Sequence, residues 1–187
     1  MNRYGTILLV IAFFISCSSD QRGAADAAGD TTRSVQTAAA AGYVQIRGDS
    51  VLLPPFEIEV SLSTRANAQL LRDKESIIVA AWFSGKPIDT TSKEYAESGE
   101  LFIKSWQVEL DSNRVAKFEG IRFSKAAYDS LADKDIRVLV NVFSGRRSSP
   151  DNLLDCHILS DKMSAVNNRT FVLTGKLIGE PDSLIIP

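Results

Sequence analysis

Residues 56–62 (FEIEVSL) alternate strictly between apolar and polar side chains, and this period constrains the fold more than any other feature. Successive side chains of a β-strand point to opposite faces, so the pattern predicts a strand with one buried and one solvated face. Residues 77–83 and 137–143 are instead apolar on both alternating faces, apart from Arg137 and Asn141. That pattern is typical of a central strand covered on both sides. The chain is therefore predicted to be built on β-sheets.

Turn residues divide the rest of the chain into further short strands. Gly48-Asp49 predicts a two-residue hairpin loop, and residues 111–114 (DSNR) predict a second hairpin. The other predicted strands are residues 43–47, 50–53, 100–110, 115–123, 153–159 and 170–178, with 184–186 as a short edge. Short strands need a second sheet to cover their apolar face. We therefore expect an all-β protein, a β-sandwich of about seven or more strands with immunoglobulin-like or transthyretin-like character.

An internal quasi-repeat accompanies the two central strands. Residues 64–86 align without gaps to residues 124–146 at an offset of 60, with seven identities. Each copy contains a hydroxyl N-cap, a two-turn helix, an Asp-Lys turn, a strand and a Gly-containing exit. The match predicts duplication or quasi-symmetry, with two short crossover helices whose Leu71 and Leu131 point inward.

The N-terminus has the pattern of a secretion signal. Arg3 precedes residues 6–15 (TILLVIAFFI), an apolar run of signal-peptide length that is too short to span a bilayer. A small residue, Ser16, comes just before Cys17. This segment resembles the signal peptide and lipobox of bacterial lipoproteins, although Phe14 stands where Leu is usual. The resemblance implies cleavage after Ser16 and acylation, for example by palmitate, of Cys17.

The predicted domains follow from this assignment: a signal peptide at 1–16, a lipidated Cys17 with a disordered tether through residue 42, and one domain at 43–187. The resemblance to sorted lipoproteins, with Ser18 after the cysteine, implies an outer-membrane protein that faces either the periplasm or the cell surface. The only membrane contact that we expect is the lipid. A net charge of −2 with 24% charged residues gives no support for nucleic-acid binding.

Groups capable of catalysis are scarce. Because Cys17 is expected to be acylated, Cys156 has no disulfide partner and is predicted to be a small core residue. The single histidine, His157, follows Cys156 directly, so on a strand the two side chains point to opposite faces. The acidic residues Asp129, Asp133 and Asp135 lack the spacing of a calcium loop and are predicted to form a solvated helix end. No cofactor or metal site is predicted.

The best candidate binding site is the pair of Gly-containing loops that follow the central strands, residues 83–87 and 143–152. We call these the exit loops. Gly lets backbone amides turn outward, hydroxyls add donors and the cations favour a carboxylate, phosphate or acidic sugar. The candidate ligand-binding residues are Lys86, Ser144, Gly145, Arg146 and Arg147. Residues 88–99, with Tyr95, are a second possible contact surface, whereas Trp82 and Trp106 are predicted to be core or sheet-face residues.

The sequence thus predicts a lipid-anchored, non-catalytic domain that binds an envelope protein, glycan or other component outside the cytoplasm. Two alternatives remain open at this stage. One is a hydrolase that acts on envelope material with a pair of carboxylates, since glycoside chemistry needs only two acids. The other is a protective inhibitor that blocks a foreign hydrolase with residues 145–152.

Overall fold

The computed structural model describes residues 42–181, all of which belong to one compact unit. The predicted signal peptide, Cys17, the tether up to residue 41 and the edge strand at 184–186 lie outside the described residues. The strands are β1 (Gln45–Arg47), β2 (Ser50–Leu52), β3 (Phe56–Leu62), β4 (Ile77–Gly85), β5 (Leu101–Leu110), β6 (Val115–Phe118), β7 (Arg122–Ser124), β8 (Arg137–Ser144), β9 (Leu154–Cys156), β10 (Leu159–Lys162) and β11 (Thr170–Leu177). The helices are α1 (Thr64–Asp73), α2 (Lys93–Ser98), α3 (Lys125–Asp129) and α4 (Met163–Val166).

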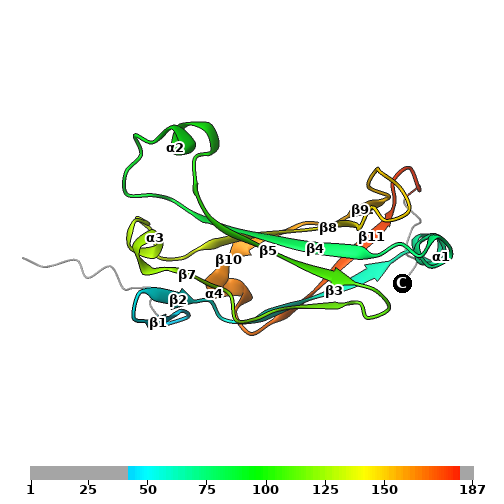
Figure 1. Ribbon diagram of the computed structural model, residues 1–187, viewed down its shortest axis with the longest axis horizontal. Coiled ribbons are helices and arrows are strands. Elements are labelled where there is room, and N and C mark those ends of the chain that lie inside the picture. The colour runs from blue at the N-terminus through cyan, green and yellow to red at the C-terminus, as the bar shows by residue number, and fades with distance from the viewer. Residues whose placement is uncertain (1–41, 182–187) are drawn as a thin grey trace, which may run out of the picture. The chain divides into compact units, whose positions relative to one another are not determined.

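The strands form three sheets, so the expected all-β class is confirmed (Figure 1). Two four-stranded sheets, in the orders β10-β8-β4-β5 and β6-β3-β11-β9, make up the layers of a sandwich-like arrangement. A small sheet, β1-β2-β7, continues it beside α3. The two predicted central strands, β4 and β8, do occupy the centre of their sheet. Four short helices, rather than the two expected, connect the described strands.

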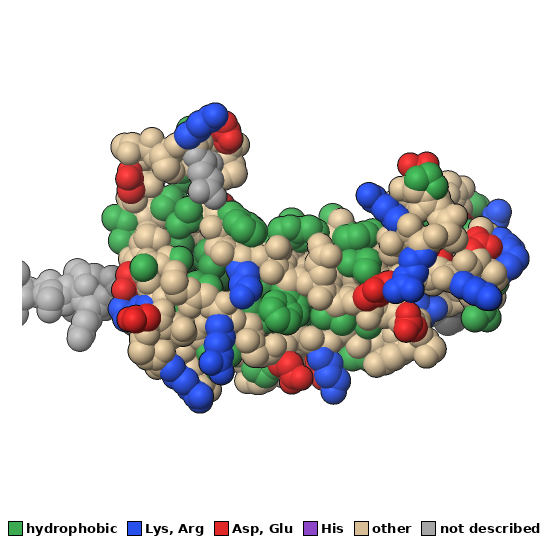
Figure 2. Space-filling view, viewed as in Figure 1, with side chains coloured by type: hydrophobic (Ala, Val, Ile, Leu, Met, Phe, Trp, Pro, Cys, Tyr) green, Lys and Arg blue, Asp and Glu red, His purple; other side chains and the backbone are tan. Residues whose placement is uncertain are grey.

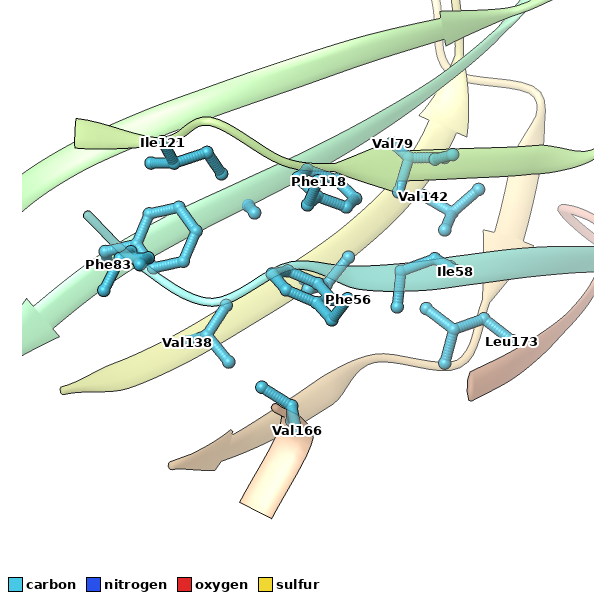
Figure 3. Packing of buried hydrophobic residues seen from close by; sticks show 14 of the residues in the cluster. Phe56, Ile58, Val79, Phe83, Phe118, Ile121, Val138, Val142, Val166 and Leu173 are labelled. Carbon is cyan, nitrogen blue, oxygen red and sulfur yellow. The ribbon is translucent and has the colours of Figure 1, made fainter. Parts of the chain in front are cut away.

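Apolar side chains from both large sheets meet between the layers (Figure 3). The alternation predicted for β3 is observed, because Phe56, Ile58 and Val60 are buried while Glu59 and Ser61 are exposed. The rings of Phe56 and Phe118 stack with centroids 4.7 Å apart, which links β3 to β6. The interior is therefore one continuous apolar cluster.

The hairpin predicted around Gly48-Asp49 is present. Arg47 of β1 pairs with Ser50 of β2, so two residues form the loop. Gly48 has a φ of +57°, a conformation that costs glycine little because it has no Cβ. Gly48 and Asp49 therefore form the turn, directly after Arg47 at the end of β1.

Two predictions about later strands are wrong. Residues 100–110 and 115–123 do not form a hairpin, because β5 pairs with β4 in one sheet and β6 pairs with β3 in the other. The predicted strand at 153–159 is split, since β9 pairs with β11 and β10 pairs with β8. In both cases the chain crosses between the layers. Alternation identifies the buried face of a strand but not its partner.

The quasi-repeat is shifted by one residue in the structure. The helix N-caps are Ser63, not Thr64, and Ser124, which corresponds to an offset of 61. Leu70 and Leu131 are buried at the same offset, whereas Leu71 is 81% exposed, so its predicted inward position is wrong. The sequence-aligned Phe83 and Phe143 also differ, because Phe83 is buried and Phe143 is half-buried on the opposite face. A slip of one residue turns every strand side chain to the other face, so the aligned identities are not equivalent positions.

Candidate functional site

The two predicted exit loops lie at opposite ends of their sheet. β4 and β8 are antiparallel neighbours, with Ile77 opposite Ser144 and Ser84 opposite Arg137. The exit of β4 therefore reaches the α3 end, where Pro87 bridges to Leu131, while the exit of β8 reaches the α1 end. Lys86 is thus separated from the other four predicted site residues.

Ser144 and Gly145 hold the fold together at the α1 end. Ser144 is fully buried, and its Oγ accepts a hydrogen bond of 2.9 Å from the Leu153 amide. Its own amide donates to Asn152 Oδ1 at 2.9 Å. The Gly145 amide donates to the Ser76 carbonyl, and a Cβ at Gly145 would lie 2.0 Å from Ser76 Oγ. Glycine is needed here because of this close approach.

The anion that the exit loop binds is the carboxylate of Glu75, from the loop between α1 and β4. The amides of Arg147 and Ser148 donate to its two oxygens at 3.0 and 2.7 Å, and Ser148 Oγ donates at 2.7 Å. The Ser76 amide donates at 3.1 Å. Glu75 is only 8% exposed. Burial raises its pKa, but these hydrogen bonds outweigh burial and lower the pKa to about 2.

A second carboxylate, Glu109 at the end of β5, holds the side chain of Arg147. Glu109 Oε1 accepts hydrogen bonds from Ser76 Oγ at 2.6 Å and Arg147 Nε at 2.8 Å, and Arg147 Nη2 lies 2.6 Å from the same oxygen. The hydrogen bond from Ser76, together with that from Arg147, lowers the pKa of Glu109. Arg147 is therefore engaged within the chain. Its neighbour Arg146 is exposed and has a φ of +57°.

Beside this network lies a cleft of about 290 Å³, bounded by α1, the start of β4 and the loop after β5. Leu70 and Leu71 give it an apolar side, and Lys74 and Arg114 add cations. Arg114 donates to Asn67 Oδ1 at 3.1 Å, whereas the ammonium of Lys74 has no ion pair among residues 42–181. Sequence reasoning missed this cleft because its parts come from three separate segments.

Local structure explains why Leu71 and Lys74 face the cleft. Ser63 caps α1 by accepting the Ala66 amide at 3.0 Å, and Ala66 and Leu70 form the buried side of the helix. Leu71 follows one position further round and is exposed. Lys74 ends the helix in the left-handed conformation, with a φ of +51°. Its amide donates hydrogen bonds to the carbonyls of Leu70 and Leu71.

The other candidate groups lie apart from the cleft. Cys156 is half-buried and has no disulfide partner among the described residues; burial, aided by Asp155, raises its pKa to about 11. His157 is exposed, with Nδ1 2.9 Å from Thr174 Oγ1. No group of three or more potential metal ligands occurs between residues 42 and 181.

Each of the three aspartates around α3 has a polar partner, and Lys162 lies near two of them, 3.3 Å from Asp133 and 3.8 Å from Asp135. Asp129 pairs with Lys125, and Asp133 pairs with Lys162. Asp135 is only 8% exposed and accepts hydrogen bonds from the amide and Oγ of Ser164 at the start of α4. Asp135 thus fixes α4 to the start of β8, instead of being solvated as predicted.

The second predicted contact surface, residues 88–99, contains α2. Ser92 caps this helix by accepting the Tyr95 amide, and Figure 1 shows α2 standing away from the sheets. Of the two tryptophans, Trp82 is half-buried on its sheet and Trp106 is 39% exposed. Both are sheet-face residues, as the sequence indicated.

No protein-family model matches the chain, and no curated protein or solved structure is significantly similar to it. None of the helices between residues 42 and 181 is long and apolar enough to cross a membrane.

Proposed function

We propose that this chain is a lipid-anchored, non-catalytic binding domain of the bacterial cell envelope, held at the outer membrane through Cys17. Its partner is an envelope component that contacts the cleft at the end of α1. The observation that carries the proposal is the exposure of Leu71, at 81%, beside the ammonium of Lys74, which forms no ion pair with residues 42–181. An exposed apolar side chain bordered by cations is a common composition for a contact surface.

The ionisation of buried Glu75 and exposed Glu109 favours binding over hydrolysis. A glycosidase needs one carboxylic acid with a raised pKa to protonate the leaving group. The pKa values of Glu75 and Glu109 are both lowered, and both side chains accept several hydrogen bonds. Neither carboxyl is suited to act as a general acid at neutral pH. This supports the non-catalytic proposal over the carboxylate-pair alternative.

For the finer fold class we propose a transthyretin-like arrangement. In an immunoglobulin constant-type sandwich the first two strands lie side by side in one sheet. Here the first two long strands, β3 and β4, belong to different sheets, and β3 pairs in parallel with β11. The immunoglobulin-like alternative is therefore less consistent with the strand order.

Photo-crosslinking in native envelopes tests the binding surface. A photoreactive amino acid replaces Leu71 in the full-length chain, and a control variant carries it in place of Ile46, a half-exposed residue of β1. We expect a discrete adduct from position 71 that Lys74→Glu abolishes, and no such adduct from position 46. Equal adducts from both positions, or none from position 71, would contradict the proposed surface.

Metabolic labelling with a fatty-acid analogue in a bacterial host tests the anchor. We expect the wild-type chain to be labelled and the Cys17→Ala variant to remain unlabelled. Equal labelling of the two would exclude lipidation at Cys17. Cys156→Ala is the matched control, and it should be labelled like the wild type.

A further inference from the structure

A second surface, distant in sequence from the cleft, combines an exposed tryptophan with unpaired cations. Trp106 lies near the middle of β5, an edge strand of its sheet, and is 39% exposed. Lys104 Nζ lies 5.6 Å from the centre of the Trp106 ring. The same Nζ donates a hydrogen bond of 2.8 Å to the Arg122 carbonyl of β7. This bond joins β5 to the free edge of the small sheet.

The small sheet continues the basic surface away from β5. Arg122 is opposite Leu52 of β2, which is opposite Gln45 of β1, and Arg47 lies two residues further along β1. Because side chains two residues apart share a face, Arg122 and Arg47 lie on the same face of this sheet. Figure 2 shows Lys and Arg side chains following one another across this side of the molecule near β7.

These cations are not neutralised within the described part of the chain. Lys104, Arg122 and Arg47 form no ion pair with residues 42–181, in contrast to the nearby Lys117 and Lys125, which pair with Glu57 and Asp129. Arg47 donates only to Gln45 Oε1, at 3.0 Å. Three uncompensated cations on one surface attract an extended anion.

The geometry points to a binding site for an acidic polysaccharide along Trp106, Lys104, Arg122 and Arg47. The cations bind carboxylates carried by successive sugars, and Arg122 and Arg47 offer the planar two-donor geometry that suits a carboxylate. The indole of Trp106 gives an apolar face on which a sugar ring packs. Sheet spacings put Arg122 and Arg47 roughly 12 Å apart, and Lys104 and Trp106 extend the surface further, which suits a chain of several sugars rather than a single small anion. The inference does not depend on the cleft at α1.

A competing interpretation is that Lys104 only protects an edge strand. Natural sheets place lysines on edges to prevent pairing with other chains, and Lys104 also caps a carbonyl of β7. That role explains neither the exposure of Trp106 nor why Arg122 and Arg47 form no ion pair within the described part of the chain. It predicts a loss of stability without any loss of binding, so experiment can separate the two roles.

Binding of polygalacturonate to the full-length chain tests the inference, with neutral dextran and polyglutamate as controls. We expect polygalacturonate to bind and the affinity to fall as salt is raised, because salt screens exposed charges. Dextran lacks the charge and polyglutamate lacks the sugar ring, so both should bind more weakly. The double variant Lys104→Gln, Arg122→Gln should weaken binding about tenfold, the loss expected when two exposed charge contacts are removed.

The variants separate the role of each group. Trp106→Ala should weaken polygalacturonate binding but leave the weak polyglutamate binding unchanged. Lys93→Gln, on α2, removes one exposed cation elsewhere and should bind as the wild type does. If thermal unfolding shows that the Lys104 or Trp106 variants fold poorly, Arg47→Gln with Arg122→Gln tests the surface without altering β5.

Three results would overturn the inference: no binding of polygalacturonate, equal binding of polyglutamate, or wild-type affinity in the folded Arg47→Gln, Arg122→Gln variant. A further variant tests whether this surface is independent of the α1 cleft. Lys74→Glu, which alters the cleft, should leave polygalacturonate binding unchanged. Conversely, the patch variants should leave the crosslink from position 71 intact.

Discussion

Glu75 is the residue on which the α1 end of the sandwich depends. Its carboxylate lies between the start of β4 and the exit of β8 and accepts hydrogen bonds from three amides and one hydroxyl. Burying a carboxylate is costly unless donors replace its water. Here the donors come from Ser76, Arg147 and Ser148, so the charge joins segments more than 70 residues apart.

Replacing Glu75 by Gln should destabilise the fold by about 2 kcal/mol at pH 7, because hydrogen bonds to a charged acceptor are lost and a buried donor is left unpaired. Urea unfolding measures this loss. Glu97→Gln, at an exposed position of α2, is the matched control and should change stability by less than about 0.5 kcal/mol. Equal effects of the two substitutions would contradict the role given to Glu75.

The same carboxylate should make stability depend on pH. The pKa of Glu75 is lowered from 4.5 to about 2, so the folded state binds this proton less readily than the unfolded state. Its contribution is therefore complete above pH 4.5 and is lost as the pH falls towards 2. Unfolding free energies at pH 5 and pH 3 should differ less in Glu75→Gln than in the wild type. An identical pH dependence would show that Glu75 is not held as described.

At the scale of elements, the register of α1 determines which leucine is structural. The Ser63 cap sets the helix so that Leu70 is 1% exposed and Leu71 is 81% exposed. Leu70→Ala should cost about 2–5 kcal/mol, because it leaves a cavity in the core. Leu71→Ala should change stability by less than about 0.5 kcal/mol. Denaturant unfolding of this matched pair checks the register, and a larger loss for Leu71→Ala would contradict it.

The pairing of β9 with β11 depends on a close contact between Gly175 and Cys156. A Cβ at Gly175 would lie 2.2 Å from Cys156 Sγ and 3.0 Å from Leu62 Cδ2. Gly175→Ala should therefore cost about 1–3 kcal/mol from overpacking. In a Cys156→Ala background the same substitution should cost less, since the sulfur is gone. A double-mutant cycle measures this coupling, and strictly additive effects would contradict the contact.

The elements differ in how well the sequence predicted them. Strict alternation identified β3, and continuous apolar character identified β4 and β8 as central strands. The partners of β5 and β9 were not predictable, because strand pairing is decided by distant segments that a local pattern does not contain. The one-residue error in α1 arose because Ser63 and Thr64 are both suitable N-caps.

At the scale of the whole described domain, the first described residues and the cleft lie at opposite ends. The Tyr43 hydroxyl donates a hydrogen bond of 2.7 Å to the Lys134 carbonyl and accepts one of 2.8 Å from the Ile136 amide. These bonds hold Tyr43 beside the start of β8. Helix α1, which contributes Leu70 and Leu71 to the cleft, lies at the other end of β8 (Figure 1). For a chain anchored through Cys17, this arrangement turns the cleft away from the point where the domain begins.

The candidate site was only partly predictable. The Gly-Ser-Arg sequence of the β8 exit predicted a binding site for an external anion; in the structure, the amides of Arg147 and Ser148 in this loop donate to the carboxylate of Glu75 of the same chain. The grouping of Lys86 with Arg146 and Arg147 required both exits to lie at one end, and the antiparallel pairing of β4 with β8 separates them. Leu71 and Lys74 became candidates only through the contacts that the fold creates.

The central claim is that an ionised Glu75 already occupies the hydrogen-bond donors of the β8 exit loop, so that these donors are not free to bind an external anion. Carboxyl-detected NMR titration of Glu75 in the full-length chain tests this most directly. The account predicts a pKa of about 2. It also predicts no change when phosphate or acetate is added, because the loop donors are already used. A pKa at or above the ordinary 4.5, or a shift on adding either anion, would contradict it.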